Sequence, residues 1–145
     1  MQALTQYLKK FINLEKRAFK LVFNTSEIKK KIIYLNTIEQ LFKKGEDSEG
    51  LELYPFYAQS TILYKKEKGQ RYDHVTLNDS GAFYKTFEVI VSDDYFLINA
   101  DPNKGDNDLL DIYGEDVLGL TEESKAEIMV LAYKVLGEKI LKIKI

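Results

Sequence analysis

The side chains best suited to chemistry are few in this sequence. His74 is the only histidine, and there is no cysteine, which excludes a cysteine nucleophile, a disulfide framework and a thiolate zinc site. His74 stands between Asp73 and Val75 in a polar stretch, so we expect an exposed surface residue rather than a general base. No nucleophile with a neighbouring base and no opposed carboxylate pair stands out. The sequence therefore predicts no enzyme, no catalytic residue and no cofactor.

An acidic stretch over residues 101–111 has the composition of a calcium-binding loop. The residues that give it this composition are Asp101, Asn103, Asp106, Asp108 and Asp111. An EF-hand loop needs glycine at its sixth position and a carboxylate at its twelfth, but counting from Asp101 these positions hold Asp106 and Ile112. We expect a solvated loop and predict no metal site, with weak ion binding left as an alternative.

Cations and aromatic side chains alternate between Tyr64 and Tyr72. The cations are Lys65, Lys66, Lys68 and Arg71. Surfaces that bind single-stranded nucleic acid combine such residues, although basic loops on acidic proteins are usually plain soluble surface. A second, aromatic cluster consists of Tyr54, Phe56 and Tyr57, and it fits a core or an interface equally well. These seven residues are the candidate interface or nucleic-acid contacts.

Charge divides the chain into two parts. Residues 1–44 hold 10 Lys/Arg against 3 Asp/Glu, a net +7, and residues 45–145 hold 11 against 20, a net −9. A basic arm on an acidic body can attract nucleic acid, and the arm of one copy can attract the body of another. The alternative is that these lysines form the solvated faces of ordinary amphipathic helices.

Length and composition favour one domain. The 145 residues are 45% hydrophobic, enough for one compact core and too few for two. The sequence contains no apolar run of about 18 residues, and Met1–Phe11 is too polar for a signal peptide. We expect a single domain over residues 1–145, made of a basic helical arm (1–44) and an acidic α+β body (45–145), soluble and without a membrane partner.

Helix signals dominate the first part. Apolar residues recur at helical steps over residues 3–23, and Asn24-Thr25-Ser26 can cap the next helix. The apolar stripe of this next helix is interrupted at Asn36-Thr37, and Thr37 followed by Gln40 fits a capping box. We therefore expect a break there and a second short helix ending at Gly45.

Strand signals are strongest at residues 87–100, where alternating residues flank Asp93-Asp94 as in a hairpin. Residues 69–74 read as a mobile polar loop. Thr121, followed by two glutamates, predicts the start of a C-terminal helix that ends near Gly137, and the alternating tail from Lys139 to Ile145 could form an edge strand or a docked end. The fold class is α+β: N-terminal amphipathic helices, a small antiparallel β-sheet built round the hairpin at about 87–100, and a C-terminal helix.

The order of several short motifs is more specific than any one of them. They are Phe42-x-x-Gly45-x-Asp47-Ser48-x-Gly50, a Thr61/Tyr64/Lys65 segment ending Lys68-Gly69, Leu77-Asn78-Asp79-Ser80-Gly81-Ala82-Phe83-Tyr84-Lys85-Thr86-Phe87, the hairpin, and Tyr113-Gly114-x-Asp116-x-Leu118-Gly119-Leu120. This arrangement, over about residues 40–120, resembles the virion-morphogenesis and tail-completion proteins of tailed bacteriophages, including Mu-like and lambdoid phages. Ser80, Phe83 and Thr86 replace that family's threonine, leucine and serine.

The resemblance implies a structural virion protein of the neck or tail terminus, in the virion or, during assembly, in the host cytoplasm. Its partners would be copies of itself in a ring and neighbouring neck or tail-tube proteins. Closing such a ring requires heterologous interfaces, which complementary basic and acidic surfaces favour. The alternative is a small nucleic-acid-binding module that contacts DNA through the basic helices and the Lys65–Tyr72 loop.

Overall fold

The computed structural model describes residues 2–142, and within the first helix it describes the side chains of residues 5–6 and 15–23. The fold is α+β. Its elements are α1 (Gln2–Phe23), α2 (Ser26–Tyr34), η1 (Leu35–Phe42), α3 (Gln59–Glu67), α4 (Ala82–Lys85), β1 (Glu88–Val91), β2 (Phe96–Asn99), β3 (Asn103–Lys104), β4 (Asn107–Asp108), α5 (Leu109–Tyr113), η2 (Glu115–Val117) and α6 (Glu122–Lys142).

The second helix does not break where the capping box predicts. Thr25 caps α2 as expected, since its hydroxyl accepts from the backbone N–H of Ile28, but the chain then continues as a π-helix, η1. Inside this helix the Thr37 hydroxyl donates to the carbonyl of Ile33 at 2.7 Å and caps nothing. The predicted break is wrong because the polar side chains of this segment bond across the fold.

The hairpin is confirmed. β1 pairs antiparallel with β2, with Val89 opposite Ile98 and Ile90 opposite Leu97. Val89 is buried while Ile90 and Leu97 are exposed, as the alternation of strand side chains requires. The acidic stretch, expected as a plain loop, forms a second short antiparallel pair, in which Asn103 lies opposite Asp108.

Two clusters of buried apolar side chains make up the core. The first joins α1, α2, β1 and α6, and the second joins η1, α4 and α5 with the segments around Leu53 and Val75. Ile33 and Ile98 pack against both clusters. Phe83 and Phe87 lie edge to face in the second cluster, with ring centroids 5.0 Å apart, as their spacing of four predicts.

The C-terminal helix starts as predicted and ends later. Thr121 accepts from the backbone N–H of Ser124 at 3.3 Å, which satisfies one free N–H group of the first turn. The helix passes through Gly137 to Lys142, so the expectation that residues 139–142 form an edge strand is wrong; residues 143–145 lie outside the described part.

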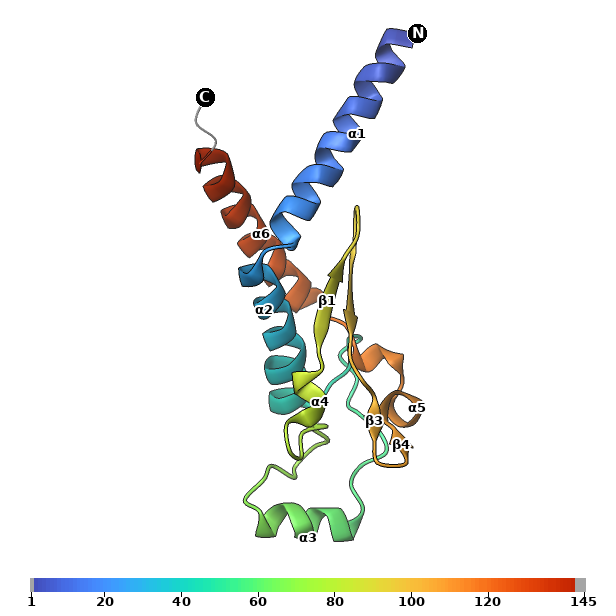
Figure 1. The fold of residues 1–145 in the computed structure, drawn as a ribbon. Helices are drawn as coiled ribbons and strands as arrows, with labels where there is room; N and C mark the ends of the chain where they lie inside the picture. The colour runs from blue at the N-terminus through green and yellow to red at the C-terminus, as the bar shows by residue number, and fades with distance from the viewer. Residues whose placement is uncertain (1, 143–145) are drawn as a thin grey trace.

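Figure 1 shows how the ends diverge. α1 and α6 cross near the hairpin and then separate, so that the N-terminal part of α1 rises away from the other elements, while α3 lies at the opposite end of the molecule. α2 and η1 pack in the core, so α1 alone projects from the basic segment 1–44. Over residues 2–142, no helix has the length and apolarity to cross a membrane.

Candidate functional site

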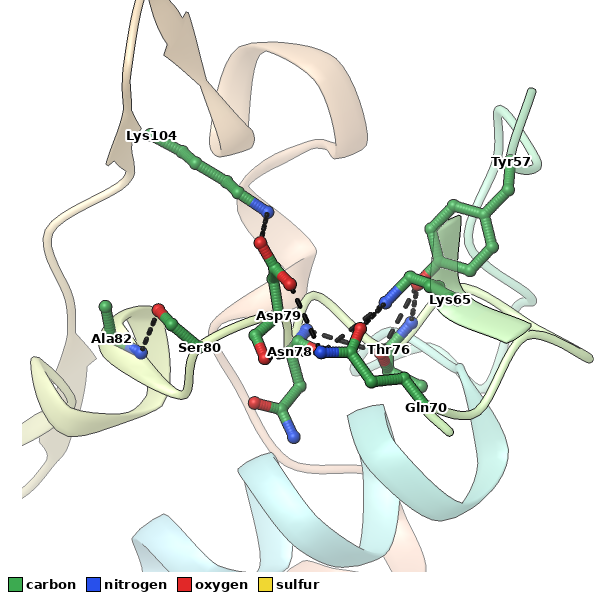
Figure 2. Close-up of polar contacts among 9 residues, drawn as sticks. All are labelled: Tyr57, Lys65, Gln70, Thr76, Asn78, Asp79, Ser80, Ala82 and Lys104. Atoms are coloured by element: carbon green, nitrogen blue, oxygen red, sulfur yellow. Dashed lines mark hydrogen bonds and ion pairs between the residues drawn. The ribbon is translucent and has the colours of Figure 1, made fainter. Parts of the chain in front are cut away.

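The Lys65–Tyr72 segment begins in the last turn of α3 and continues into a loop, and Lys65 and Gln70 reach residues 78 and 79, as Figure 2 shows. The Lys65 side chain is buried, and its ammonium lies 3.4 Å from both the Gln70 Oε1 and the carbonyl oxygen of Asn78. It also lies 4.9 Å from the centre of the Tyr57 ring, a position that favours a cation over an aromatic face. Lys65 therefore clamps the loop and is not an exposed contact.

Gln70 extends this clamp to Asp79. Its Nε2 donates to the carbonyl of Asp79 at 3.0 Å and to the Asp79 Oδ1 at 3.2 Å, and the Lys104 ammonium lies 3.8 Å from Oδ2. The bond from Gln70 and the nearby lysine charges lower the pKa of Asp79 because they favour its carboxylate form. The predicted mobile loop is thus tied down by side-chain bonds.

Tyr57 is the partly buried residue of the aromatic cluster. Its hydroxyl accepts from the backbone N–H of Thr76 at 2.8 Å, and the carbonyl of Thr76 accepts from the hydroxyl of Tyr84. Burial raises the pKa of Tyr84. Tyr54 and Phe56 are exposed, with Tyr54 83% accessible. The cluster therefore divides: Tyr57 supports the fold, and Tyr54 and Phe56 form surface.

The other three cations of the patch are exposed and have neighbours within the loop. Lys66 lies 5.0 Å from the Tyr72 ring centre and Lys68 4.7 Å from that of Tyr64. The Arg71 Nε donates to Asp73 at 2.7 Å. The charges of Lys66 and Lys68 therefore remain exposed to solvent, whereas the charge of Arg71 is compensated by the Asp73 carboxylate.

His74 is buried, which corrects the expectation of an exposed residue. Its Nε2 donates to the carbonyl of Phe42 at 2.6 Å, and its Nδ1 lies 3.3 Å from the Asp73 carboxylate. Gly45, with a φ of +65°, leaves the space that the ring occupies. The ring therefore lies between the end of η1 and Asp73 and holds these two segments together.

The acidic stretch uses its carboxylates on its own backbone. Asp101 Oδ1 accepts from the backbone N–H of Asn103 at 3.0 Å, and Asp108 caps α5 by accepting from the N–H groups of Leu110 and Asp111. Among residues 2–142, no group of three or more His, Asp or Glu side chains is placed to hold a metal ion.

Two of the motifs that carry the phage resemblance meet in space. The backbone N–H of Ser48, in the first motif, donates to the carbonyl of Asp116, in the last, at 2.8 Å. A side chain at Gly119 would place its Cβ 3.0 Å from the Cβ of Ser48, so the two segments pack closely. Sequence reasoning placed these motifs in order but gave no sign that they touch.

Comparison with known proteins finds no match: no family model, no curated protein and no solved structure is similar to this chain.

Proposed function

We propose that this protein is a structural component of the neck or tail terminus of a tailed bacteriophage, acting without catalysis by docking onto copies of itself and adjoining virion proteins. The observation that carries the proposal is α1. This 22-residue helix is about 33 Å long at 1.5 Å per residue, and it rises away from the other elements (Figure 1).

The C-terminal end of α1 packs against the rest of the fold. Val22 and Phe23 belong to the first core cluster, with Phe19 packed against it, and Lys20 forms a 2.7 Å ion pair with Asp93 at the hairpin tip. Amphipathic helices gain most of their stability from packing of their apolar face. A projecting amphipathic helix is therefore a natural docking element for another chain.

Further support comes from charge and from the body. α1 contains five Lys/Arg and one Glu, a net +4, while residues 45–145 carry a net −9, and these opposite charges favour head-to-tail contact between copies. The contact between Ser48 and Asp116 stabilises the part of the chain that resembles the tail-completion proteins. Localisation in the virion neck or tail, and in the host cytoplasm during assembly, belongs to the same proposal.

The test is deletion of the gene from the phage or prophage that carries it, followed by electron microscopy of the lysate. We expect heads and tails that accumulate unjoined or tails that end irregularly, with normal particles restored by supplying the gene in trans. Normal joined particles from the deletion strain would overturn the proposal.

A further inference from the structure

An apolar groove lies at the base of α1. Its volume is about 470 Å³, within the range of about 300–1,000 Å³ that binding clefts usually have. Its walls come from the end of α1, from the hairpin turn and β2, from residues 118–120 after η2 and from the start of α6; they include Phe19, Phe23, Asp94, Leu97, Lys125 and Met129. Tyr95, Leu97 and Met129 are each about half exposed, so large apolar side chains remain in contact with water.

The groove lining contains one carboxylate, that of Asp94. It makes no ion pair with the described side chains of residues 5–6 and 15–142. Lys125 is the cation in the lining, and its ammonium lies 3.0 Å from Glu122. An apolar cleft with one unpaired carboxylate fits a partner that is apolar and basic.

α1 has this chemistry. Leu4, Leu8 and Phe11 recur in its sequence at steps of four and three, the spacing that places residues on one helical face. The same half of the helix carries Lys9 and Lys10, so the segment is basic as well as apolar. A basic amphipathic helix laid in an apolar groove is a recurrent mode of recognition.

The groove cannot receive the helix to which it belongs. Phe19 and Phe23 of α1 are part of its wall, and from there the helix runs away from the body (Figure 1). A continuous helix cannot turn back on its own base. We infer that the groove receives the N-terminal half of α1 from a second copy of this chain. This inference rests on the proposed function, which it deepens by naming the two surfaces that meet.

The contact is heterologous, because the donated helix and the receiving groove are different surfaces. Each copy gives one helix and accepts another, so the assembly grows head to tail and ends only by closing into a ring. The base of every α1 also contributes to the next contact, through Phe19 and Phe23.

The experiment uses two double variants and sedimentation velocity. The arm variant carries Leu8→Glu and Phe11→Glu, and the groove variant carries Leu97→Glu and Met129→Glu. The wild-type protein is expected to self-associate, and each variant alone to be monomeric, with its dissociation constant raised about thirtyfold or more. An equimolar mixture is expected to form a 1:1 dimer, since one intact helix meets one intact groove. A control with Tyr133→Glu and Leu141→Glu, exposed outside the groove, assembles like the wild type.

A second measurement uses milder substitutions and the absence of cysteine. Copies with Leu8→Cys, mixed with copies carrying Leu97→Cys and treated with a bismaleimide, should give a crosslinked heterodimer. Replacing the second partner by Leu141→Cys should not.

Three results would overturn the inference. They are a wild-type protein that stays monomeric at about 100 μM, a groove variant that still dimerises alone, and equal crosslinking to both cysteine partners. The second would show pairing of helix with helix and leave assembly into a virion untouched, so it is distinguishable from failure of the proposed function, which the particle images report.

Discussion

The side-chain amide of Asn36 accepts a hydrogen bond at 3.0 Å from the backbone N–H of Gly119, 83 positions further along the chain. The same side chain donates through Nδ2 to the carbonyl of Val117 at 2.9 Å. One turn later, Gln40 donates to the carbonyl of Gly119 at 2.9 Å and accepts from the N–H of Thr121 at 3.3 Å. Two side-chain amides on one helix thus form the hydrogen bonds of backbone N–H and carbonyl groups in the segment that joins η2 to α6.

Asn36→Ala should therefore be strongly destabilising. Asn36 is fully buried, and the substitution leaves the N–H of Gly119 and the carbonyl of Val117 without partners. Unsatisfied buried groups cost about 1–3 kcal/mol each, so we expect a loss of about 2–5 kcal/mol in the free energy of unfolding, measured by urea titration. Asn99→Ala, which removes one exposed bond to Glu88, is the control and should change it by less than about 0.5 kcal/mol. A similar small loss at Asn36 would contradict the role assigned here.

Gly45→Ala and Gly50→Ala form a matched pair. Both glycines have positive φ, +65° and +76°, which costs a non-glycine residue about 1 kcal/mol. An added Cβ at Gly45 would lie 2.5 Å from the His74 Cδ2, whereas at Gly50 nothing lies within 4 Å. We expect thermal unfolding to show Gly45→Ala as the more damaging by at least about 1–3 kcal/mol; equal effects would mean that the histidine ring has room to move.

Lys65→Met tests whether the patch lysines have different roles. The substitution keeps an apolar chain of similar length but leaves the Gln70 Oε1 and the carbonyl of Asn78 without the ammonium. We expect a loss of about 1–3 kcal/mol in chemical denaturation. Lys66→Met, at an exposed position of the same helix, should lie within about 0.5 kcal/mol of the wild type. The reverse order would place the structural role on Lys66.

The Arg71 guanidinium lowers the pKa of Asp73 to about 2, from an ordinary value of 3.8. A lowered pKa contributes stability above the ordinary value, and this contribution is lost as the pH falls through about 2. Arg71→Gln should raise the pKa of Asp73 toward its ordinary value, which removes this contribution to stability above about pH 4. Carboxyl NMR titration checks this, with Arg17→Gln, on α1, as the control. An unchanged Asp73 titration in Arg71→Gln would assign the shift to another group.

Local patterns predicted the elements well and their long-range contacts poorly. The hairpin and the caps at Thr25 and Thr121 depend on neighbouring residues, so the sequence alone indicated them. Asn36 appeared to break a helix because its partners, Val117 and Gly119, lie far along the chain.

The patch at residues 64–72 shows the same difference between local pattern, which was predicted, and long-range contacts, which were not. Alternating charge and aromatic character identified residues 64–72, and four of its members do contact aromatic rings. The burial of Lys65 and His74 depends on where residues 42 and 78 come to lie, which no short window of sequence contains. The one sequence feature related to the burial of His74 is the glycine at position 45. The structure shows why a glycine is needed there, because a side chain at this position would overlap the His74 ring.

Ile33 and Ile98 touch both apolar clusters, and this arrangement governs how the body melts. Separating either cluster exposes these two side chains, which removes packing from the other at the same moment. Unfolding of one cluster therefore destabilises the other, and we expect both to unfold in one cooperative transition. Calorimetry should show a single peak whose van't Hoff and calorimetric enthalpies agree.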